Sequence, residues 1–431
     1  MSVIKRNRCT ITALNSRGLG ISNLDSNIEL PYTIPEEIVE FEEHIYRNKI
    51  SYSLLRIIDE SKNRITPPCR YFTICGGCSL QHLEHNYYYQ IKLANLKRVL
   101  AEYNVIATTI HNINFIGAEN RRRAVFKAVK KHEVLFLGFK KLHSNQIVNI
   151  DNCLLLTREL SDLIPPLKNT LQKILSDKEK CKILVTMADN GIDLTIEIEN
   201  NNIISTEAKE ILEYFAVNNK IIRLTIINNI KWNLIYLLEI PYILFENIAV
   251  KIDNLCFLQV SKESDIILTK LVNDIFEKIK TPNQFQIADL FCGRGTLTIP
   301  ASKFGIVDGF EMEKNSVKAL ANAIKNTNLK TTIYQRDLFI KPLEWDELNK
   351  YDVVIINPPR AGAKQQAFIL SKSTVKTIIY LSCNPESFAR DAKLILNNNR
   401  YQLKEITPID QFYWSHHIEL LAVFELNIEV F

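Results

Sequence analysis

The sequence predicts a fold of three parts, ending in an α/β domain built on a doubly wound parallel sheet. The main observation is that strand-like runs alternate with helical segments from Phe257 onward, as in parallel sheets covered by helices on both faces. Residues 1–58 instead show short β-type runs separated by turns, which predict a small all-β module. We expect this module to be an OB-like β-barrel, mainly because of the glycine turn at Gly18 and Gly20. Residues 59–249 combine clustered cysteines, a helical segment at about residues 80–110 and several strand-like runs, which predict a central α+β domain. We place the last domain at residues 250–431.

Length and composition are those of a soluble globular protein with more than one domain. The chain has 431 residues, of which 46% are hydrophobic and 23% are charged, and its net charge is +5. Its most apolar stretch, Ile221 to Val250, is interrupted by polar and charged residues and is no membrane span. The N-terminus lacks the apolar core of a signal peptide. We therefore expect a cytoplasmic monomer with no membrane partner.

Positive charge is concentrated between Glu119 and His143. Eight basic residues lie there against two acidic ones, and they are Arg121, Arg122, Arg123, Lys127, Lys130, Lys131, Lys140 and Lys141. Because lysine and arginine neutralise backbone phosphates, this basic segment is a candidate for phosphate contact. A solvated charged hairpin is the alternative interpretation.

A glycine-containing turn follows the strand-like run that ends near Asp289. Gly293 and Gly295 would let the backbone approach a ligand closely, while the next helix presents its free N–H groups. Glu311 ends a second strand, twenty-two residues after Asp289, where an acid suits a ribose diol. Asp337 follows a third strand and is placed to hold an adenine amino group. The turn lacks the third glycine of the dinucleotide fingerprint, which favours a nucleoside cofactor other than NAD.

Two further polar residues follow strands of the predicted sheet, and a third lies near the C-terminus. Asn357 comes after a buried strand and begins an Asn-Pro-Pro-Arg loop, at the sheet edge where ligands bind. Cys383 comes after the next strand, where a thiol beside a cofactor is placed to attack a substrate, although most such cysteines are inert core residues. Glu419 lies near the C-terminus two residues after His417 and is a candidate base, or one of a polar pair on an edge strand.

Several motifs together resemble those of the RNA uracil-5-methyltransferase family, in particular the branch with a TRAM domain and an iron–sulfur cluster. In order along nearly the whole chain they are Cys69-x5-Cys-Gly-Gly-Cys-x-Leu-Gln-His, Asn120-Arg-Arg-Arg-Ala, Gly138-Phe-Lys-Lys, Phe257-Leu-Gln-Val, Asp289-Leu-Phe-Cys-Gly-x-Gly, Asn357-Pro-Pro-Arg-Ala-Gly, Ser382-Cys-Asn-Pro and His417-x-Glu419. Each motif is modest alone, but the set in this order is specific.

The resemblance implies a class I, Rossmann-like domain that uses S-adenosylmethionine to methylate carbon 5 of a uridine. That carbon is too weakly nucleophilic to take the methyl group unaided, so a thiolate first adds to carbon 6 and a base later removes the carbon-5 proton. By the resemblance Cys383 is the nucleophile and Glu419 the base. The cofactor pocket would hold Gln259, Asp289, Phe291, Gly293, Glu311, Asp337 and Asn357. With RNA as the substrate, Arg121, Arg122 and Arg123 become the candidate RNA contacts.

Two positions depart from the family pattern. The family usually has Asp where Asn357 stands, which removes one charge near the cofactor and base pocket. The Phe-Pro-x-Thr that usually precedes the base is here Phe412-Tyr-Trp-Ser. Neither change removes a reacting group.

The nine cysteines include three with the spacing C-x5-C-x2-C, namely Cys69, Cys75 and Cys78. In a chain without a secretion signal these predict metal ligands rather than disulfides. The resemblance supplies Cys153 as a fourth ligand. Four thiolates suit zinc or an iron–sulfur cluster, and spacing does not decide between them; the resemblance favours [4Fe–4S].

The TRAM and cluster branch is similar to enzymes that act on large-subunit (23S) ribosomal RNA, whereas the tRNA branch usually lacks both features. A tRNA or cytosine-5 RNA methyltransferase is the nearest alternative. An exocyclic-amine methyltransferase also carries Asn-Pro-Pro, but here Arg360 follows instead of an aromatic residue, and Cys383 would have no role. The last alternative is a non-catalytic RNA-binding protein, against which an intact Cys383 and Glu419 argue.

Overall fold

The structure is a computed structural model that describes residues 3–46, 49–199, 205–228, 231–279 and 283–427. The chain forms two compact units. The first comprises residues 1–98 together with 139–148 and 414–417, and the second comprises the rest. None of the helices in the described ranges is long and apolar enough to cross a membrane.

The first unit contains a five-stranded antiparallel sheet with the strand order β3-β2-β1-β4-β5. Its strands are β1 (Val3–Leu14), β2 (Gly20–Ser22), β3 (Glu29–Leu30), β4 (Ile38–Tyr46) and β5 (Lys49–Asp59). Alternate side chains point inward and form a small core of Cys9, Ile11, Leu30, Val39 and Phe41. The terminal strands β3 and β5 contact each other, so the sheet curls into a half-barrel. The predicted OB-like barrel is confirmed in this coarser form.

Helix α1 (His85–Glu102) follows the cysteine-containing segment. It lies within the helical segment predicted at about residues 80–110. The expectation that this helix packs on the catalytic domain stays a prediction.

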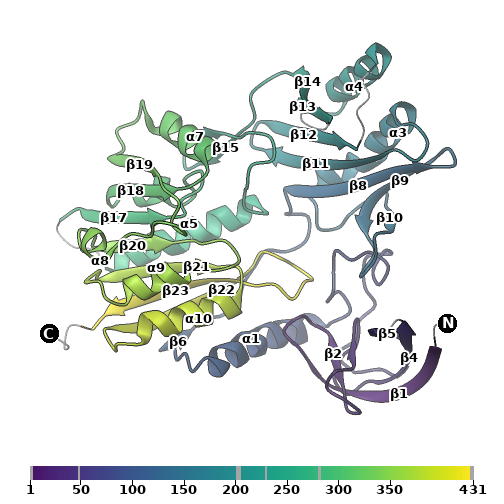
Figure 1. Ribbon diagram of the computed structural model, residues 1–431, viewed down its shortest axis with the longest axis horizontal. Helices are drawn as coiled ribbons and strands as arrows, with labels where there is room; N and C mark the ends of the chain where they lie inside the picture. Colours follow the sequence, from purple (N-terminus) through teal and green to yellow (C-terminus); the bar gives the residue numbers. More distant parts are fainter. Residues whose placement is uncertain (1–2, 47–48, 200–204, 229–230, 280–282, 428–431) are drawn as a thin grey trace. The chain divides into compact units, whose positions relative to one another are not determined.

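A seven-stranded mixed sheet follows in the chain, with the order β10-β9-β8-β11-β12-β13-β14 (Figure 1). Its strands are β8 (Arg123–Lys131), β9 (Val134–Lys140), β10 (Ile147–Asn149), β11 (Lys180–Ala188), β12 (Gly191–Ile198), β13 (Ile221–Asn228) and β14 (Lys231–Leu237). Its helices are α2 (Arg158–Asp162), α3 (Ile164–Ile174) and α4 (Thr206–Asn218). Strands β12 and β13 are parallel, with α4 between them in the chain, and the basic segment forms the antiparallel hairpin β8–β9.

A hairpin of β15 (Tyr242–Phe245) and β16 (Ile248–Lys251) leads into the third sheet. This nine-stranded sheet has the order β19-β18-β17-β20-β21-β23-β22-β6, and β7 also pairs with β22. The strands are β6 (Thr109–Ile110), β7 (Asn114–Phe115), β17 (Phe285–Leu290), β18 (Gly305–Glu311), β19 (Thr331–Gln335), β20 (Val353–Ile356), β21 (Thr377–Ser382), β22 (Tyr401–Asp410) and β23 (Glu419–Leu426). Strands β17 to β21 are parallel, and β23 enters antiparallel between β21 and β22.

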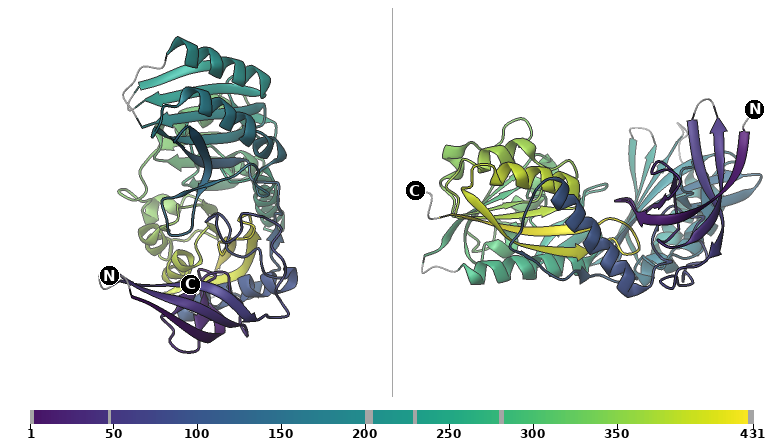
Figure 2. Two further views of the ribbon diagram at one scale, coloured as in Figure 1. Left: turned by 90° about the vertical axis from the view of Figure 1, so that its right-hand side faces the viewer. Right: turned by 90° about the horizontal axis from the view of Figure 1, so that it is seen from below.

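Helices cover both faces of this sheet, as predicted for a doubly wound domain. They are α5 (Lys262–Lys278), α6 (Thr298–Ala301), α7 (Lys314–Ile324), α8 (Trp345–Leu348), α9 (Lys364–Leu370) and α10 (Pro385–Leu396). Helices α9 and α10 lie on one face and α5 on the other (Figures 1 and 2). The central strands are therefore buried on both faces, which explains why β20 reads Val-Val-Ile-Ile without alternation.

The order of the parallel strands reverses beside β17, which has β18 on one side and β20 on the other. Ligands of open α/β sheets bind at the carboxyl ends of strands at such a point. Strands β11 to β14 belong to the same compact unit as this sheet, so the predicted boundary at residue 250 falls inside one unit and stays a prediction.

Candidate active site

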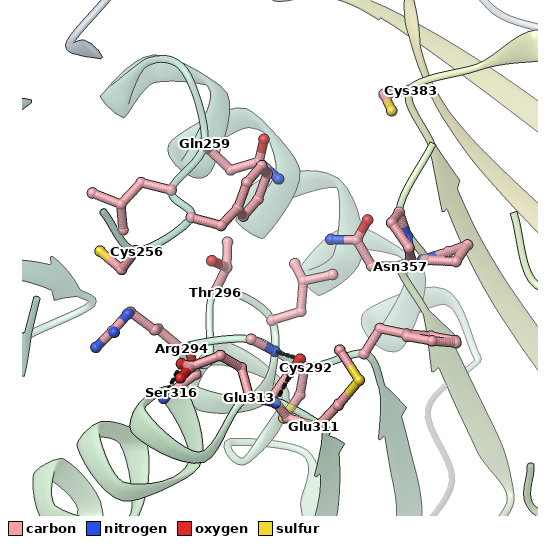
Figure 3. Close-up of a pocket in the computed structure, with 18 of the residues that line it drawn as sticks. Cys256, Gln259, Cys292, Arg294, Thr296, Glu311, Glu313, Ser316, Asn357 and Cys383 are labelled. Carbon is pink, nitrogen blue, oxygen red and sulfur yellow. Dashed lines mark hydrogen bonds between the residues drawn. The ribbon is translucent and has the colours of Figure 1, made fainter. Parts of the chain in front are cut away.

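A cavity of about 680 Å³ lies at the carboxyl ends of the parallel strands in the second unit. Its size is typical of a site for a drug-sized ligand. Every residue that the sequence assigned to the catalytic and cofactor sites lines it. These residues are Gln259, Asp289, Phe291, Gly293, Glu311, Asp337, Asn357, Cys383 and Glu419. Figure 3 shows Glu311 and Cys383 toward different ends of the cavity, with Asn357 between them in the view.

The turn after β17 has a backbone that brings main-chain atoms to the cavity. Phe291, Gly293 and Gly295 all have positive φ, at 61°, 57° and 92°. A Cβ at Gly293 would have open space around it, whereas one at Gly295 would lie 2.5 Å from Leu320 of α7. Gly293 thus leaves room beside the cavity, and Gly295 lets α7 approach closely. Positive φ at the non-glycine Phe291 is a strained conformation of the kind that clusters at functional sites.

Carboxylates at two neighbouring strand ends are held by backbone N–H groups. Glu311 accepts hydrogen bonds from the N–H of Gly293 at 3.0 Å and from that of Glu313 at 2.8 Å. Asp337 accepts one from the N–H of Phe339 at 2.9 Å. Both side chains are therefore fixed in orientation where they face the cavity.

Asp289 is a buried carboxyl group at the end of β17, with 1% of its surface exposed. Its pKa is raised to about 7, mainly by burial and also by the charge of Glu311, while a hydrogen bond from the Thr298 hydroxyl at 2.6 Å opposes the rise. Its second oxygen, Oδ1, is buried and has no hydrogen-bond partner among the described residues. Asp289 therefore has an acceptor atom available to a cationic ligand.

Cys383 follows the last residue of β21 and directly precedes Asn384, the N-cap of α10. The thiol is half-buried, and its pKa is raised by burial and by the charge of Glu419. A backbone hydrogen bond and the charge of Arg360 act in the opposite direction. The resting cysteine is thus a protonated thiol that must lose its proton before it can attack.

Glu419 begins β23 and is 3% exposed. Burial raises its pKa to about 7, and a hydrogen bond from Gln411 limits the rise. Gln411 Nε2 donates to Glu419 Oε2 at 2.7 Å. The two residues meet because β22 and β23 pair antiparallel with Ile409 opposite Glu419, and Gln411 comes just after the end of β22. A carboxylate with a pKa near neutrality is suited to act as a base at physiological pH.

Comparison with known proteins identifies the family. The family model described as tRNA (uracil-5-)-methyltransferase matches residues 84–425. The chain belongs to this family. The expected enzyme class, an RNA uracil-5-methyltransferase, is thereby confirmed.

Relatives of this uracil-5-methyltransferase chain span nearly its whole length. An uncharacterized RNA methyltransferase of Brucella melitensis biotype 1 is 32% identical over 428 residues, covering 98% of this chain and 99% of the relative. The 23S rRNA (uracil(1939)-C(5))-methyltransferase RlmD of Francisella tularensis subsp. novicida is 29% identical and covers 96% of both chains. The crystal structure of a Pyrococcus abyssi tRNA (uracil-54, C5)-methyltransferase with S-adenosyl-L-homocysteine shares the fold. It superposes with a TM-score of 0.71 at 20% identity, covering 97% of this chain and all of that one.

Arg122 requires a correction, because the sequence placed it among the RNA contacts and the structure buries it. Only 4% of its surface is exposed, and its guanidinium donates to Asp265 at 2.6 Å and to the Gln259 carbonyl at 3.1 Å. In an extended segment, side chains of successive residues point to opposite faces, so three consecutive arginines cannot share one surface. Arg121 and Arg123 are partly exposed and stay candidates.

A second buried arginine also holds the segment that lines the cavity. Arg294, in the glycine turn, donates to the Lys251 carbonyl at 2.7 Å and to Asp253 at 2.8 Å. Arg294 therefore holds the segment from Asp253 to Gln259 at its first residue, and Arg122 holds it at its last. The sequence analysis missed this role of both arginines, and it missed Gln411.

The predicted metal ligands are distributed over the two units. Cys69, Cys75 and Cys78 lie in the first unit and Cys153 in the second. Cys75 and Cys78 both lie near Tyr32, whose pKa is raised to about 12 by burial and by these two thiols. Within the described residues, no three cysteine, histidine, aspartate or glutamate side chains form a group that could hold a metal ion. The cluster therefore stays a prediction that rests on the resemblance.

Proposed function

We propose that this protein methylates carbon 5 of a specific uridine in 23S ribosomal RNA, with S-adenosylmethionine as the methyl donor. The observation that supports this most strongly is that Cys383 and Glu419 line the same cavity as Glu311 and Asp337. A thiol nucleophile, a base and two nucleoside-binding carboxylates are the groups that the reaction requires.

The cofactor half of the cavity suits a nucleoside that carries a charged amino acid. Asp289 offers its unpartnered oxygen to the ammonium group, and Glu311 offers carboxylate lone pairs to the ribose hydroxyls. Asp337 would accept a hydrogen bond from the adenine amino group. Bound S-adenosylmethionine supplies an electrophilic methyl group on its sulfonium.

Cys383 opens the reaction at the other end of the cavity. Its thiolate forms a bond to carbon 6 of the uracil, and the electron pair of the 5,6 double bond moves toward carbon 5 and oxygen 4. Carbon 5 then bonds to the methyl group as the sulfur–methyl bond of the donor breaks, and S-adenosylhomocysteine is the leaving group. The ionised Glu419 takes the carbon-5 proton, the double bond re-forms, and the thiolate of Cys383 leaves. The released thiolate of Cys383 takes up a proton in place of the one that it lost before the attack, and Glu419 gives up the carbon-5 proton, so each residue returns to its starting state.

The ribosomal target rests on the similarity to RlmD, which acts on 23S rRNA and matches this chain along nearly its whole length. The basic hairpin β8–β9 supports an RNA substrate, with Arg121 and Arg123 as its candidate contacts. We propose that the half-barrel is a TRAM-like domain and that the protein is a cytoplasmic monomer. From the resemblance alone, we also propose that Cys69, Cys75, Cys78 and Cys153 hold a [4Fe–4S] cluster.

Mass spectrometry of ribosomal RNA from a strain that lacks this gene tests the function. One 5-methyluridine should disappear from 23S rRNA and return when the wild-type gene is restored. The Cys383→Ala gene should not restore it. Loss of 5-methyluridine from tRNA instead would favour a tRNA methyltransferase. Loss of a 5-methylcytidine would favour a cytosine-5 methyltransferase, and no change in any modified nucleoside would favour a non-catalytic RNA-binding protein.

A further inference from the structure

We infer that Gln411 reads the target base, so that the site accepts uracil and rejects cytosine. This inference rests on the proposed function and names the residue that selects the base. Gln411 lines the same cavity as Cys383 and Glu419 and is 7% exposed. One hydrogen bond holds its amide nitrogen, and its amide oxygen has no hydrogen-bond partner among the described residues.

The orientation of the Gln411 amide follows from its partner. An ionised carboxylate only accepts hydrogen bonds, so the nitrogen of the amide must face Glu419. The structure has this orientation, with Gln411 Nε2 2.7 Å from Glu419 Oε2. The carbonyl oxygen, Oε1, then points elsewhere. It is buried and has no hydrogen-bond partner among the described residues. Such an atom is costly to bury unless a ligand satisfies it.

The pattern of donors on uracil matches the free atoms of this amide. Uracil presents a donor at N3 next to an acceptor at O4, and cytosine presents the reverse. Gln411 Oε1 accepts from the uracil N3–H, and the second hydrogen of Nε2 is available for O4. O4 is attached to the carbon next to carbon 5, so the amide that holds Glu419 beside carbon 5 also reaches the O4 and N3 edge.

Cytosine would leave the same atoms unsatisfied. Its N3 carries a lone pair, which would face the lone pairs of Oε1, and its amino group would face the Nε2 hydrogen. A site built around a substrate hydrogen bond rejects an analogue that lacks it by roughly 10⁴-fold. One residue therefore holds the catalytic base and distinguishes the two pyrimidines.

The test compares covalent trapping of two fluorinated bases, because trapping does not require Glu419. A synthetic hairpin RNA that copies the mapped methylation site carries 5-fluorouridine or 5-fluorocytidine at the target. Fluorine cannot leave as a cation, so the adduct with Cys383 persists after methyl transfer. The rate of adduct formation is measured on denaturing gels for the wild type, Gln411→Met and Glu419→Gln.

The wild type should trap 5-fluorouridine far faster than 5-fluorocytidine. In Gln411→Met, which removes both polar atoms at similar length, the ratio of the two rates should fall by roughly a hundredfold. Glu419→Gln keeps the Gln411 amide and still offers a side-chain oxygen that can accept from Gln411 Nε2, so this variant should retain a preference for uridine. Unchanged affinity for S-adenosylmethionine shows that the Gln411→Met protein is folded.

The outcomes separate this inference from the function on which it rests. A wild-type protein that forms no adduct with 5-fluorouridine contradicts the proposed function. If the wild type forms the adduct but Gln411→Met has the same preference for uridine over cytidine as the wild type, only the role of Gln411 is contradicted. A second measurement needs no variant, since replacing the target by 3-deazauridine, which lacks the N3–H, should weaken binding to the wild-type protein. Equal binding of both RNAs would overturn the inference.

Discussion

Release of the methylated RNA should slow steeply as the pH falls through about 7, because Glu419 must be ionised to take the carbon-5 proton. Burial raises the pKa of this carboxyl group to about 7. The base is therefore present above this pH and is lost below it. For a single ionisation, about half of the molecules hold the active base at pH 7, about a tenth at pH 6 and about a hundredth at pH 5.

Gln411 provides a way to shift this profile in a known direction. Its N–H stabilises the ionised form of Glu419 and so lowers the pKa of Glu419. A hydrogen bond to a charged group contributes about 1.5–3 kcal/mol, and about 1.4 kcal/mol corresponds to one pKa unit. Gln411→Met should therefore raise the midpoint of the profile by about one to two pH units.

A rapid-quench single-turnover experiment measures this step directly, as the rate at which the methylated protein–RNA adduct disappears. Adduct formation with 5-fluorouridine RNA is the control, since it depends on Cys383 and not on Glu419. Burial raises the pKa of the Cys383 thiol, so the control rate should keep rising with pH beyond neutrality. A midpoint for Gln411→Met at or below that of the wild type would refute the assignment of Glu419 as the base held by Gln411.

Three further predictions follow from buried or clustered groups. The affinity for S-adenosylmethionine should fall as the pH drops through about 7, because the ammonium group of S-adenosylmethionine pairs with ionised Asp289. Calorimetry should show that this pH dependence is lost in Asp289→Asn. Arg122→Met should raise the dissociation constant for S-adenosylmethionine about tenfold or more and lower the free energy of unfolding by about 3–5 kcal/mol, because Asp265 loses its buried partner. Arg122→Lys should recover part of the affinity and part of the stability. An unchanged dissociation constant in Arg122→Met would show that the Arg122–Asp265 pair does not position the segment from Asp253 to Gln259. Protein purified without oxygen should contain about four irons per chain and lose them in Cys153→Ser; stoichiometric zinc without iron would contradict the cluster.

The residues at the ends of parallel strands were predictable from the sequence alone. Asp289, Glu311, Asn357 and Cys383 each follow an apolar run, and parallel strands of one sheet place their carboxyl ends along the same edge. The sequence pattern and the parallel topology together therefore predict most of the functional residues that line the cavity. The same reasoning gave the half-barrel and the doubly wound sheet.

Roles that depend on pairing across the chain were not predictable. Gln411 reaches Glu419 only through the register of β22 against β23, which the sequence does not state. Arg122 is one of three identical neighbours, and only the burial of the segment decides which of them faces Asp265. Arg294 occupies a position that the glycine motif leaves unspecified, so its contacts with Lys251 and Asp253 had no local signal.

The buried contact of Arg122 with the Gln259 carbonyl has a thermodynamic consequence. Arg122 lies directly between Arg121 and Arg123, the proposed RNA contacts, so under that proposal one short stretch of backbone serves both ligands. If RNA binding steadies this stretch, it also steadies the cofactor segment and increases affinity for the methyl donor. Linkage is reciprocal, so the donor must then strengthen RNA binding by the same factor. Each substrate would then bind more tightly to the enzyme that already holds the other.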